Sequence, residues 1–156
     1  MTSTTATALA TQVYQVFIKA TPETIWEAIV KPEFTTKYFH GTKIESSFEP
    51  GTPYLSVAGD RDETVVDGEI VESDPPRMLR HTWRALYDPE TAEEPHSRVT
   101  WEIEAQEGGV TKLTVTHDQL EAAPKTAESV AGGWSYVLSG LKTLLETGKP
   151  LSTESM

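Results

Sequence analysis

The clearest pattern of apolar and polar positions lies near the C-terminal end of the chain. Between residues 130 and 146 apolar side chains recur at steps of three and four, which places them on one face of a helix. They are Val130, Trp134, Val137, Leu138, Leu141 and Leu145. Glycines at 132, 133 and 140 are unfavourable inside a helix, because glycine has a low helix propensity. They indicate a late start near Gly133 or close packing of Gly140 on a neighbouring strand; the alternative is a loosened first turn that gates a cavity.

Upstream, from about residue 43 to 118, the period changes to two. Leu79, His81 and Trp83 alternate with Arg80, Thr82 and Arg84, and the segments around Trp101 and Val115 behave in the same way. Such alternation is typical of an antiparallel sheet with one covered face. We expect strands at 13–20, 44–48, 54–58, 64–72, 77–84, 97–106 and 110–119. The apolar members should face the long helix.

Two short helices should follow the first strand. Thr21 and Pro22 suit the cap and first position of a helix that ends before Pro32, and a second helix should run from 32 to about 39. Residues 87–96 lack apolar periodicity and are expected to form an exposed loop. The predicted order is β-α-α-β6-α, an α+β fold with a seven-stranded antiparallel sheet and a long C-terminal helix. We predict one domain over 12–151 and disordered tails at 1–11 and 152–156.

Composition and charge exclude several classes of function. A formal net charge of −11 opposes binding to nucleic acid or to an anionic membrane surface. The chain has no cysteine, which removes disulfides, thiolate nucleophiles and cysteine-based zinc sites. It shows neither a membrane-length apolar run nor a signal peptide. We expect a cytoplasmic protein, a monomer or weak homodimer, that needs no cofactor.

Several segments together resemble a known family. They are residues 20–28, with Pro22 and Trp26, residues 68–79 with their Asp-Pro-Pro turn, His81-Thr82-Trp83, and Gly133-Trp134 with Leu138 and Leu141. In order and spacing they are similar to the START-like (SRPBCC) superfamily, and most to the branch named for the activator of the 90-kDa heat-shock chaperone ATPase. The resemblance runs from about residue 13 to 151. It implies a helix-grip fold, in which the sheet curls around the C-terminal helix and leaves a cavity between them.

Large aromatic side chains are expected to converge between sheet and helix. Trp83, Trp101 and Trp134 fall on inward positions, where they either fill the core or line an apolar ligand site. We take a ligand site as the working hypothesis. Its predicted residues are Phe39, Phe48, Tyr54, His81, Trp83, Trp101, His117, Trp134, Leu138 and Leu141.

His81 and His117 are the imidazoles on apolar strand faces. The simpler interpretation is a hydrogen-bonded core histidine, and the sharper one makes His81 a general acid–base or a ligand anchor. His40 and His96 are expected at the surface. No metal-ligand spacing, nucleophile motif or phosphate loop is present, and the carboxylates fall on outward positions or in loops. Arg98 and Glu102 should form a surface ion pair.

Three functions compete. The first is binding or sequestration of a small apolar or aromatic molecule, such as a lipid, polyketide or other natural product, as in the self-resistance members of the superfamily. The second is a cyclase or aromatase that uses the same cavity, with His81 as first candidate and Tyr54 and His117 after it. The third is a chaperone-interacting module. The chaperone activators carry a separate N-terminal domain, and we expect this chain to leave no room for one, which counts against the third function. We prefer the first function because of the inward aromatics, the absence of a catalytic set and the fold that the resemblance implies.

Overall fold

A computed structural model describes residues 10–151 of the chain. In chain order its elements are β1 (Gln12–Ile18), α2 (Pro22–Val30), α3 (Pro32–Tyr38), β2 (Thr42–Glu45), β3 (Pro53–Ala58), β4 (Glu63–Asp74), β5 (Met78–Ala85), α4 (Pro89–Ala92), β6 (Ser97–Ala105), the 3-10 turn η1 (Glu107–Gly109), β7 (Thr111–Asp118), α5 (Pro124–Val130) and α6 (Gly133–Thr147). Apart from Ala10 and Thr11, the predicted tails lie outside the described residues. Ala10 is buried, and its carbonyl accepts from the Leu120 amide.

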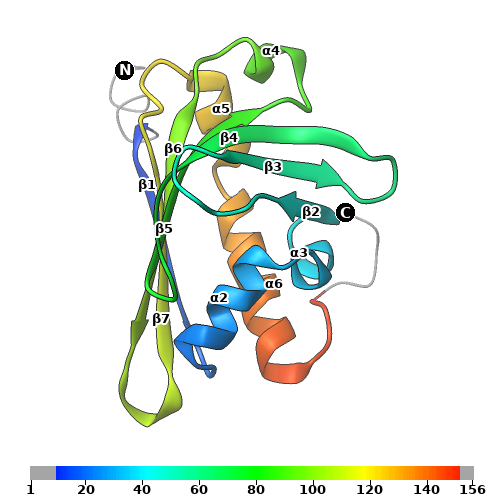
Figure 1. Ribbon diagram of the computed structural model, residues 1–156. Helices are drawn as coiled ribbons and strands as arrows, with labels where there is room; N and C mark the ends of the chain where they lie inside the picture. Colours follow the sequence, from blue (N-terminus) through cyan, green and yellow to red (C-terminus); the bar gives the residue numbers. More distant parts are fainter. Residues whose placement is uncertain (1–9, 152–156) are drawn as a thin grey trace.

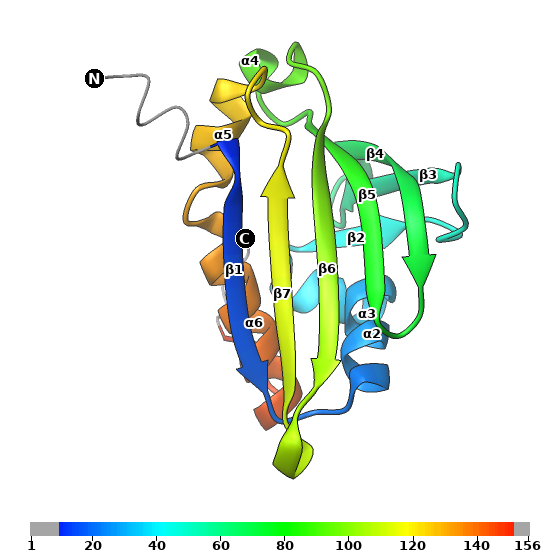
Figure 2. The ribbon, with the colours of Figure 1, turned by 90° about the vertical axis from the view of Figure 1, so that its left-hand side faces the viewer.

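The strands form one seven-stranded sheet in the order β1-β7-β6-β5-β4-β3-β2, with every neighbouring pair antiparallel. Strands β1, β7, β6 and β5 make a tall face with α6 behind it (Figure 2). Strands β4, β3 and β2 bend away and cross above α2 and α6 (Figure 1). The sheet thus curls around the C-terminal helix, and the predicted α+β helix-grip fold is confirmed.

Close backbone packing at Gly68 accompanies this curl. A Cβ at Gly68 would lie 1.9 Å from the Thr82 carbonyl oxygen of β5, which no other residue type could tolerate without backbone movement. The glycine therefore lets β4 approach β5 at the point where the tall face gives way to the crossing strands.

Local sequence signals explain the first two helices. The Thr21 hydroxyl accepts from the Thr24 amide at 3.1 Å, and Pro22 occupies the first turn of α2, as predicted. Lys31 is extended, as the residue before a proline prefers to be, and α3 begins at Pro32.

The predicted long C-terminal helix is confirmed as α6, but Val130 lies in a separate, shorter helix, α5. Ala131 is extended and Gly132 has a φ of 83°, so α5 ends at Val130 and α6 begins at Gly133, the late start that the glycines indicated. Gly140 does pack closely, but on a helix rather than a strand. A Cβ there would lie 3.3 Å from the Cβ of Tyr38 in α3.

Two further expectations are corrected. The strand predicted over 44–48 ends at Glu45, because the Ser46 hydroxyl accepts from the Phe48 amide at 3.0 Å and Phe48 takes a φ of 60°. The segment 87–96 contains the short helix α4, capped by the Asp88 carboxylate.

The apolar positions of β5, β6 and β7 face α6 and form one core, with their polar neighbours outward. On that outer face Arg98 bonds Asp118 in bidentate fashion, at 2.9 and 2.7 Å, rather than the predicted Glu102. The two strands place Arg98 directly opposite Asp118. Within residues 10–151 no helix is both long and apolar enough to span a membrane.

Candidate ligand cavity

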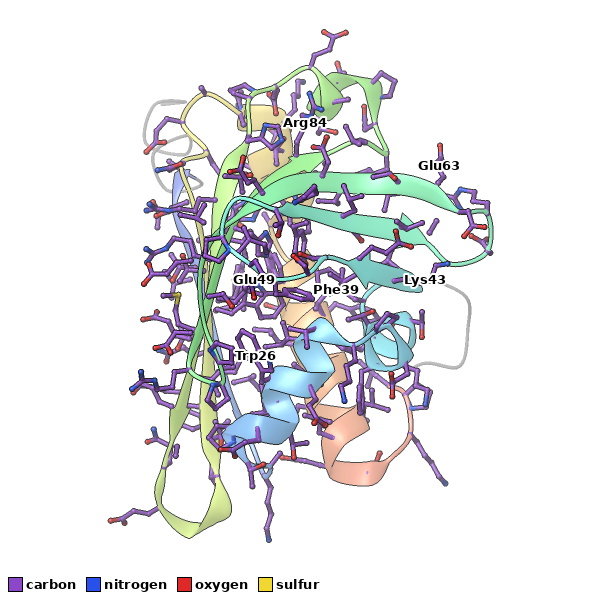
Figure 3. The ribbon with its side chains drawn as sticks, viewed as in Figure 1. Trp26, Phe39, Lys43, Glu49, Glu63 and Arg84 are labelled. Atoms are coloured by element: carbon purple, nitrogen blue, oxygen red, sulfur yellow. The ribbon has the colours of Figure 1, made fainter. Side chains whose placement is uncertain are left out.

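A cavity of about 440 Å³ lies where the crossing strands meet the junction of α5 and α6. It is lined by the end of α3, by β2, β3, β4 and β5, and by the segment that joins the two C-terminal helices. The lining residues are Phe39, His40, Gly41, Thr42, Ser56, Ala58, Asp60, Arg61, Val65, Val66, Trp83, Tyr87, Ser129, Val130, Gly133, Trp134 and Val137. Phe39 points into the interior between sheet and helix, whereas Glu63 lies at the outer tip of the β3–β4 hairpin (Figure 3).

A β-bulge shapes the strand side of the cavity. Ser56 pairs with Val66, but the next residue of β3, Val57, pairs with Thr64, so Val65 is an extra residue on β4. A bulge of this kind turns side chains out of strict alternation. Consequently Val65 and Val66 are both buried, and both line the cavity.

Three aromatic rings from distant segments form one wall. Phe39 stacks on Trp83 with ring centroids 6.3 Å apart, and it meets Trp134 edge-to-face at 5.7 Å. The centroids of Trp83 and Trp134 lie 5.5 Å apart. These are favourable aromatic geometries, and they fix three flat apolar surfaces at one site.

A hydrogen-bond chain behind this wall holds Trp134. Its Nε1 donates to Nδ1 of His117 at 3.0 Å, while Nε2 of His117 lies 2.7 Å from the Ser97 hydroxyl. That hydroxyl donates to the Trp83 carbonyl at 3.2 Å, so His117 Nε2 is the donor to Ser97. Burial, with a smaller contribution from His81, lowers the pKa of His117 to about 3. The imidazole is neutral and fully bonded.

His81 is held in a similar way one layer further in. Its Nδ1 donates to the Thr82 carbonyl at 2.9 Å, and its Nε2 accepts from Trp101 Nε1 at 3.1 Å. The Tyr54 ring stacks on the imidazole with centroids 3.7 Å apart. The side chain is completely buried, and burial lowers the pKa of His81 to about 4. Neither ring nitrogen is free to act on a substrate.

A strap formed by residues 86–96 and α5 borders the cavity on the helix side. The Tyr87 hydroxyl and the Ser129 hydroxyl are 2.6 Å apart. The Glu94 carboxylate accepts from the amides of Lys125 and Thr126 at 2.9 and 2.8 Å, and from the Thr126 hydroxyl at 2.8 Å. The Glu94 carboxylate therefore caps the N-terminus of α5 and connects this helix to residues 86–96.

His40 lines the cavity at the end of α3 and stacks on Tyr136, with centroids 6.2 Å apart. It is exposed, as predicted, and partial burial lowers its pKa from the ordinary value. Its φ of 55° turns the chain towards Gly41 and β2.

Two buried polar atoms have no hydrogen-bond partner among the described residues, the Tyr54 hydroxyl and Trp83 Nε1. Burial raises the pKa of Tyr54, which is therefore protonated at neutral pH. Within residues 10–151 no group of three or more histidine and acidic side chains could hold a metal ion.

The structure brings three of the predicted site residues to the cavity: Phe39, Trp83 and Trp134. The other predicted residues pack in the surrounding core, and their part in binding stays a prediction: Phe48, Tyr54, His81, Trp101, His117, Leu138 and Leu141. Sequence reasoning missed Ser56 and Val66, although both lie on predicted strands. It also missed Tyr87 and Ser129, for which no periodic signal exists.

Comparisons with known proteins agree with this fold. The crystal structure of CalU16 from Micromonospora echinospora superposes with a TM-score of 0.68 at 19% identity, over 88% of this chain and 77% of that one. DynU16, a putative protein in the dynemicin biosynthetic locus, superposes with a TM-score of 0.73 at 22% sequence identity. The match covers 90% of this chain and 49% of DynU16, so this chain spans about half of DynU16. PFC0360w, an HSP90 activator from Plasmodium falciparum, superposes with a TM-score of 0.70 at 21% sequence identity, over 90% of this chain and 98% of that one. No curated protein matches the sequence.

At these identities the structural likenesses establish the fold alone. The sequence itself carries the family assignment, since residues 19–146 match the family described as Activator of Hsp90 ATPase homolog 1-like protein. That match runs from the end of β1 to the last turns of α6 and includes the residues that enclose the cavity. The chain therefore belongs to the Activator of Hsp90 ATPase homolog 1-like family, on the START-like helix-grip fold.

Proposed function

We propose that the chain binds or sequesters a small apolar or aromatic molecule in the cavity between sheet and C-terminal helices. The observation that carries this proposal is the wall of Phe39, Trp83 and Trp134 beside a volume of about 440 Å³. Cavities of roughly 300–1,000 Å³ with aromatic linings are typical of small-molecule sites.

A binding role accounts for the histidines better than a catalytic one. A general acid–base must reach the substrate through a free ring nitrogen. Both nitrogens of His81 and both nitrogens of His117 are already bonded inside the protein. Neither residue lines the cavity.

The structural relatives support a natural product as the ligand class. DynU16 comes from a biosynthetic locus, that of dynemicin, and it shares this fold. Within this proposal the ligand is a lipid, a polyketide or another aromatic natural product, and sequestration would protect the producing cell. We propose that the protein acts in the cytoplasm as a monomer or weak homodimer.

Tryptophan fluorescence tests the binding role. The purified protein is titrated with fatty acids, flavonoids, aromatic polyketides and macrolides. We expect saturable quenching at micromolar ligand in the wild type, which the Trp83→Phe variant weakens. Trp83 is the cleaner position because its Nε1 has no hydrogen bond to lose. Trp26, outside the cavity lining, provides the matched control as Trp26→Phe.

Trp134→Phe is the second cavity variant. It unpairs Nδ1 of His117, so its urea unfolding curve is recorded beside the titration. A flat fluorescence response across the whole panel would contradict the proposed binding function.

One observation favours a second candidate, a chaperone-interacting module. Val13 and Phe17 are 57% and 51% exposed on the outer side of the edge strand β1. Exposed apolar side chains of this kind mark protein contacts when they are contiguous. The test is the ATPase rate of Hsp90 with the wild-type chain and with Phe17→Ser. If the wild-type chain stimulates the ATPase and Phe17→Ser does not, this function is supported. If the wild-type chain leaves the ATPase rate of Hsp90 unchanged, this function is excluded.

A further inference from the structure

Four residues with hydroxyl groups line the cavity, Thr42, Ser56, Tyr87 and Ser129, and they differ in what they bond. The Thr42 hydroxyl donates to the Phe39 carbonyl at 2.6 Å, and the Ser129 hydroxyl is paired with Tyr87. Among the described residues 10–151 the Ser56 side chain has no hydrogen-bond partner, yet its hydroxyl is not one of the fully enclosed unpaired atoms, which are the Tyr54 hydroxyl and Trp83 Nε1. Ser56 as a whole is only 2% exposed. A hydroxyl placed in this way offers one donor and two acceptor sites to whatever occupies the cavity.

Backbone register fixes the position of this hydroxyl relative to the aromatic wall. Ser56 on β3 pairs with Val66 on β4, which pairs with Ala85 on β5, two residues after Trp83. Neighbouring strands lie about 4.8 Å apart, so roughly 10 Å separate the β3 and β5 positions. That span is about the length of a two-ring aromatic system.

The strand residues next to Ser56 are apolar, so its hydroxyl is the polar group on this wall of the cavity. Val65 and Val66 lie beside it because of the bulge, and Ala58 is the next inward-facing residue on its own strand. On this strand wall a ligand oxygen meets the Ser56 hydroxyl, and a ligand without an oxygen leaves that hydroxyl unsatisfied. The other unpaired polar atom of a lining residue is Trp83 Nε1, which can only donate.

We propose that the Ser56 hydroxyl is the polar anchor of the cavity. The ligand class that it selects has an apolar or aromatic body against Trp83 and Trp134 and a carbonyl, hydroxyl or ether oxygen at one end. This inference rests on the proposed binding function and adds to it the position and chemistry of the ligand's polar end.

Two matched probes test the anchor, 2-acetylnaphthalene and 2-ethylnaphthalene, which differ chiefly in one carbonyl oxygen. Each is titrated into wild type, Ser56→Ala and Ser139→Ala by tryptophan fluorescence, and the dissociation constants are compared. Ser139→Ala is the matched control because it removes an exposed serine hydroxyl of α6 that does not line the cavity. Thermal unfolding of each variant establishes that the fold is retained.

We expect Ser56→Ala to weaken binding of the ketone by about 5- to 10-fold, the effect of one hydrogen bond. The hydrocarbon should keep its affinity within about twofold, and Ser139→Ala should weaken neither probe. If both probes bind and Ser56→Ala affects them equally, the anchor is refuted while the binding function stands. If neither probe nor any member of the fluorescence panel binds the wild type, the binding function fails and the anchor fails with it.

Discussion

Acid should destabilise this protein through its two buried histidines. In the native state His81 and His117 are neutral, with pKa values of about 4 and about 3, because burial disfavours the charged ring. In the unfolded chain a histidine has an ordinary pKa of about 6.5. Below that pH the unfolded state binds protons that the native state does not, so the free energy of unfolding falls as pH falls.

The size of the effect follows from linkage. At pH 5.5, midway between pH 6.5 and 4.5, each imidazole binds about 0.9 proton more in the unfolded state than in the native state. Two such groups give a slope of roughly 2.5 kcal/mol per pH unit. Between pH 6.5 and 4.5 each histidine accounts for about 2 kcal/mol, a large share of an ordinary domain's stability. Below the native pKa values the loss levels off, because the native state then takes up the same protons.

Urea denaturation between pH 7.5 and 4.5 measures this slope directly. The comparison uses wild type, His81→Gln and His117→Gln, in which one titrating ring is removed at a time. Each variant starts from lower stability at pH 7, since Trp101 or Trp134 loses its acceptor in its present geometry. Each should also lose about half of the wild-type pH slope. His96→Gln, changed at an exposed imidazole, controls for the loss of any histidine.

Either of two results would refute the reasoning. Wild-type stability that is flat from pH 6.5 to 4.5 would mean that the native histidines titrate as freely as the unfolded ones. Variants with the full wild-type slope would mean that other groups carry the pH dependence.

Three further substitutions test the packing at two glycines and the cap of α5. Gly68→Ala should cost about 3 kcal/mol or more in urea unfolding, because its Cβ would meet the Thr82 carbonyl oxygen at 1.9 Å. Gly133→Ala, with open space around its Cβ in α6, should be neutral or stabilising by up to about 1 kcal/mol, and equal losses at both glycines would contradict the account. Glu94→Gln should cost about 1–2 kcal/mol through the weakened cap of α5. Amide hydrogen exchange should then accelerate at Lys125 and Thr126 but not in α6. Unchanged exchange at Lys125 and Thr126 would exclude a capping role for Glu94.

Periodicity carried most of the fold prediction, because a buried face repeats every second or fourth residue. The inward phases of His81, Trp83 and Trp101 were correct, and so was the strand count. The hydrogen bond from Trp101 to His81 could not be predicted, since it depends on the register of β5 against β6. Alternation gives the face on which a side chain lies but not its partner across the ladder.

The candidate site was predictable only in part, for the same reason. Trp83 and Trp134 line the cavity, and their part in binding stays a prediction, whereas Tyr54 and His81 pack against each other in the core. The bulge at Val65 shifts which residues reach the cavity, and a bulge leaves no period to detect. The strap contact of Tyr87 joins two non-periodic segments 42 residues apart.

The pairing of β1 with β7 has a consequence for how the chain is made. Gln12 lies opposite His117 and Ile18 opposite Thr111, so the first strand finds its partner only after about a hundred further residues have been synthesised. Helix α6 packs on the same strand and arrives later still. Contacts this distant in sequence slow folding, because a long loop must close before they form. On the ribosome, apolar residues of β1 that the native fold buries, such as Ile18, therefore stay exposed until β7 is made, and a chaperone could shield them during that time.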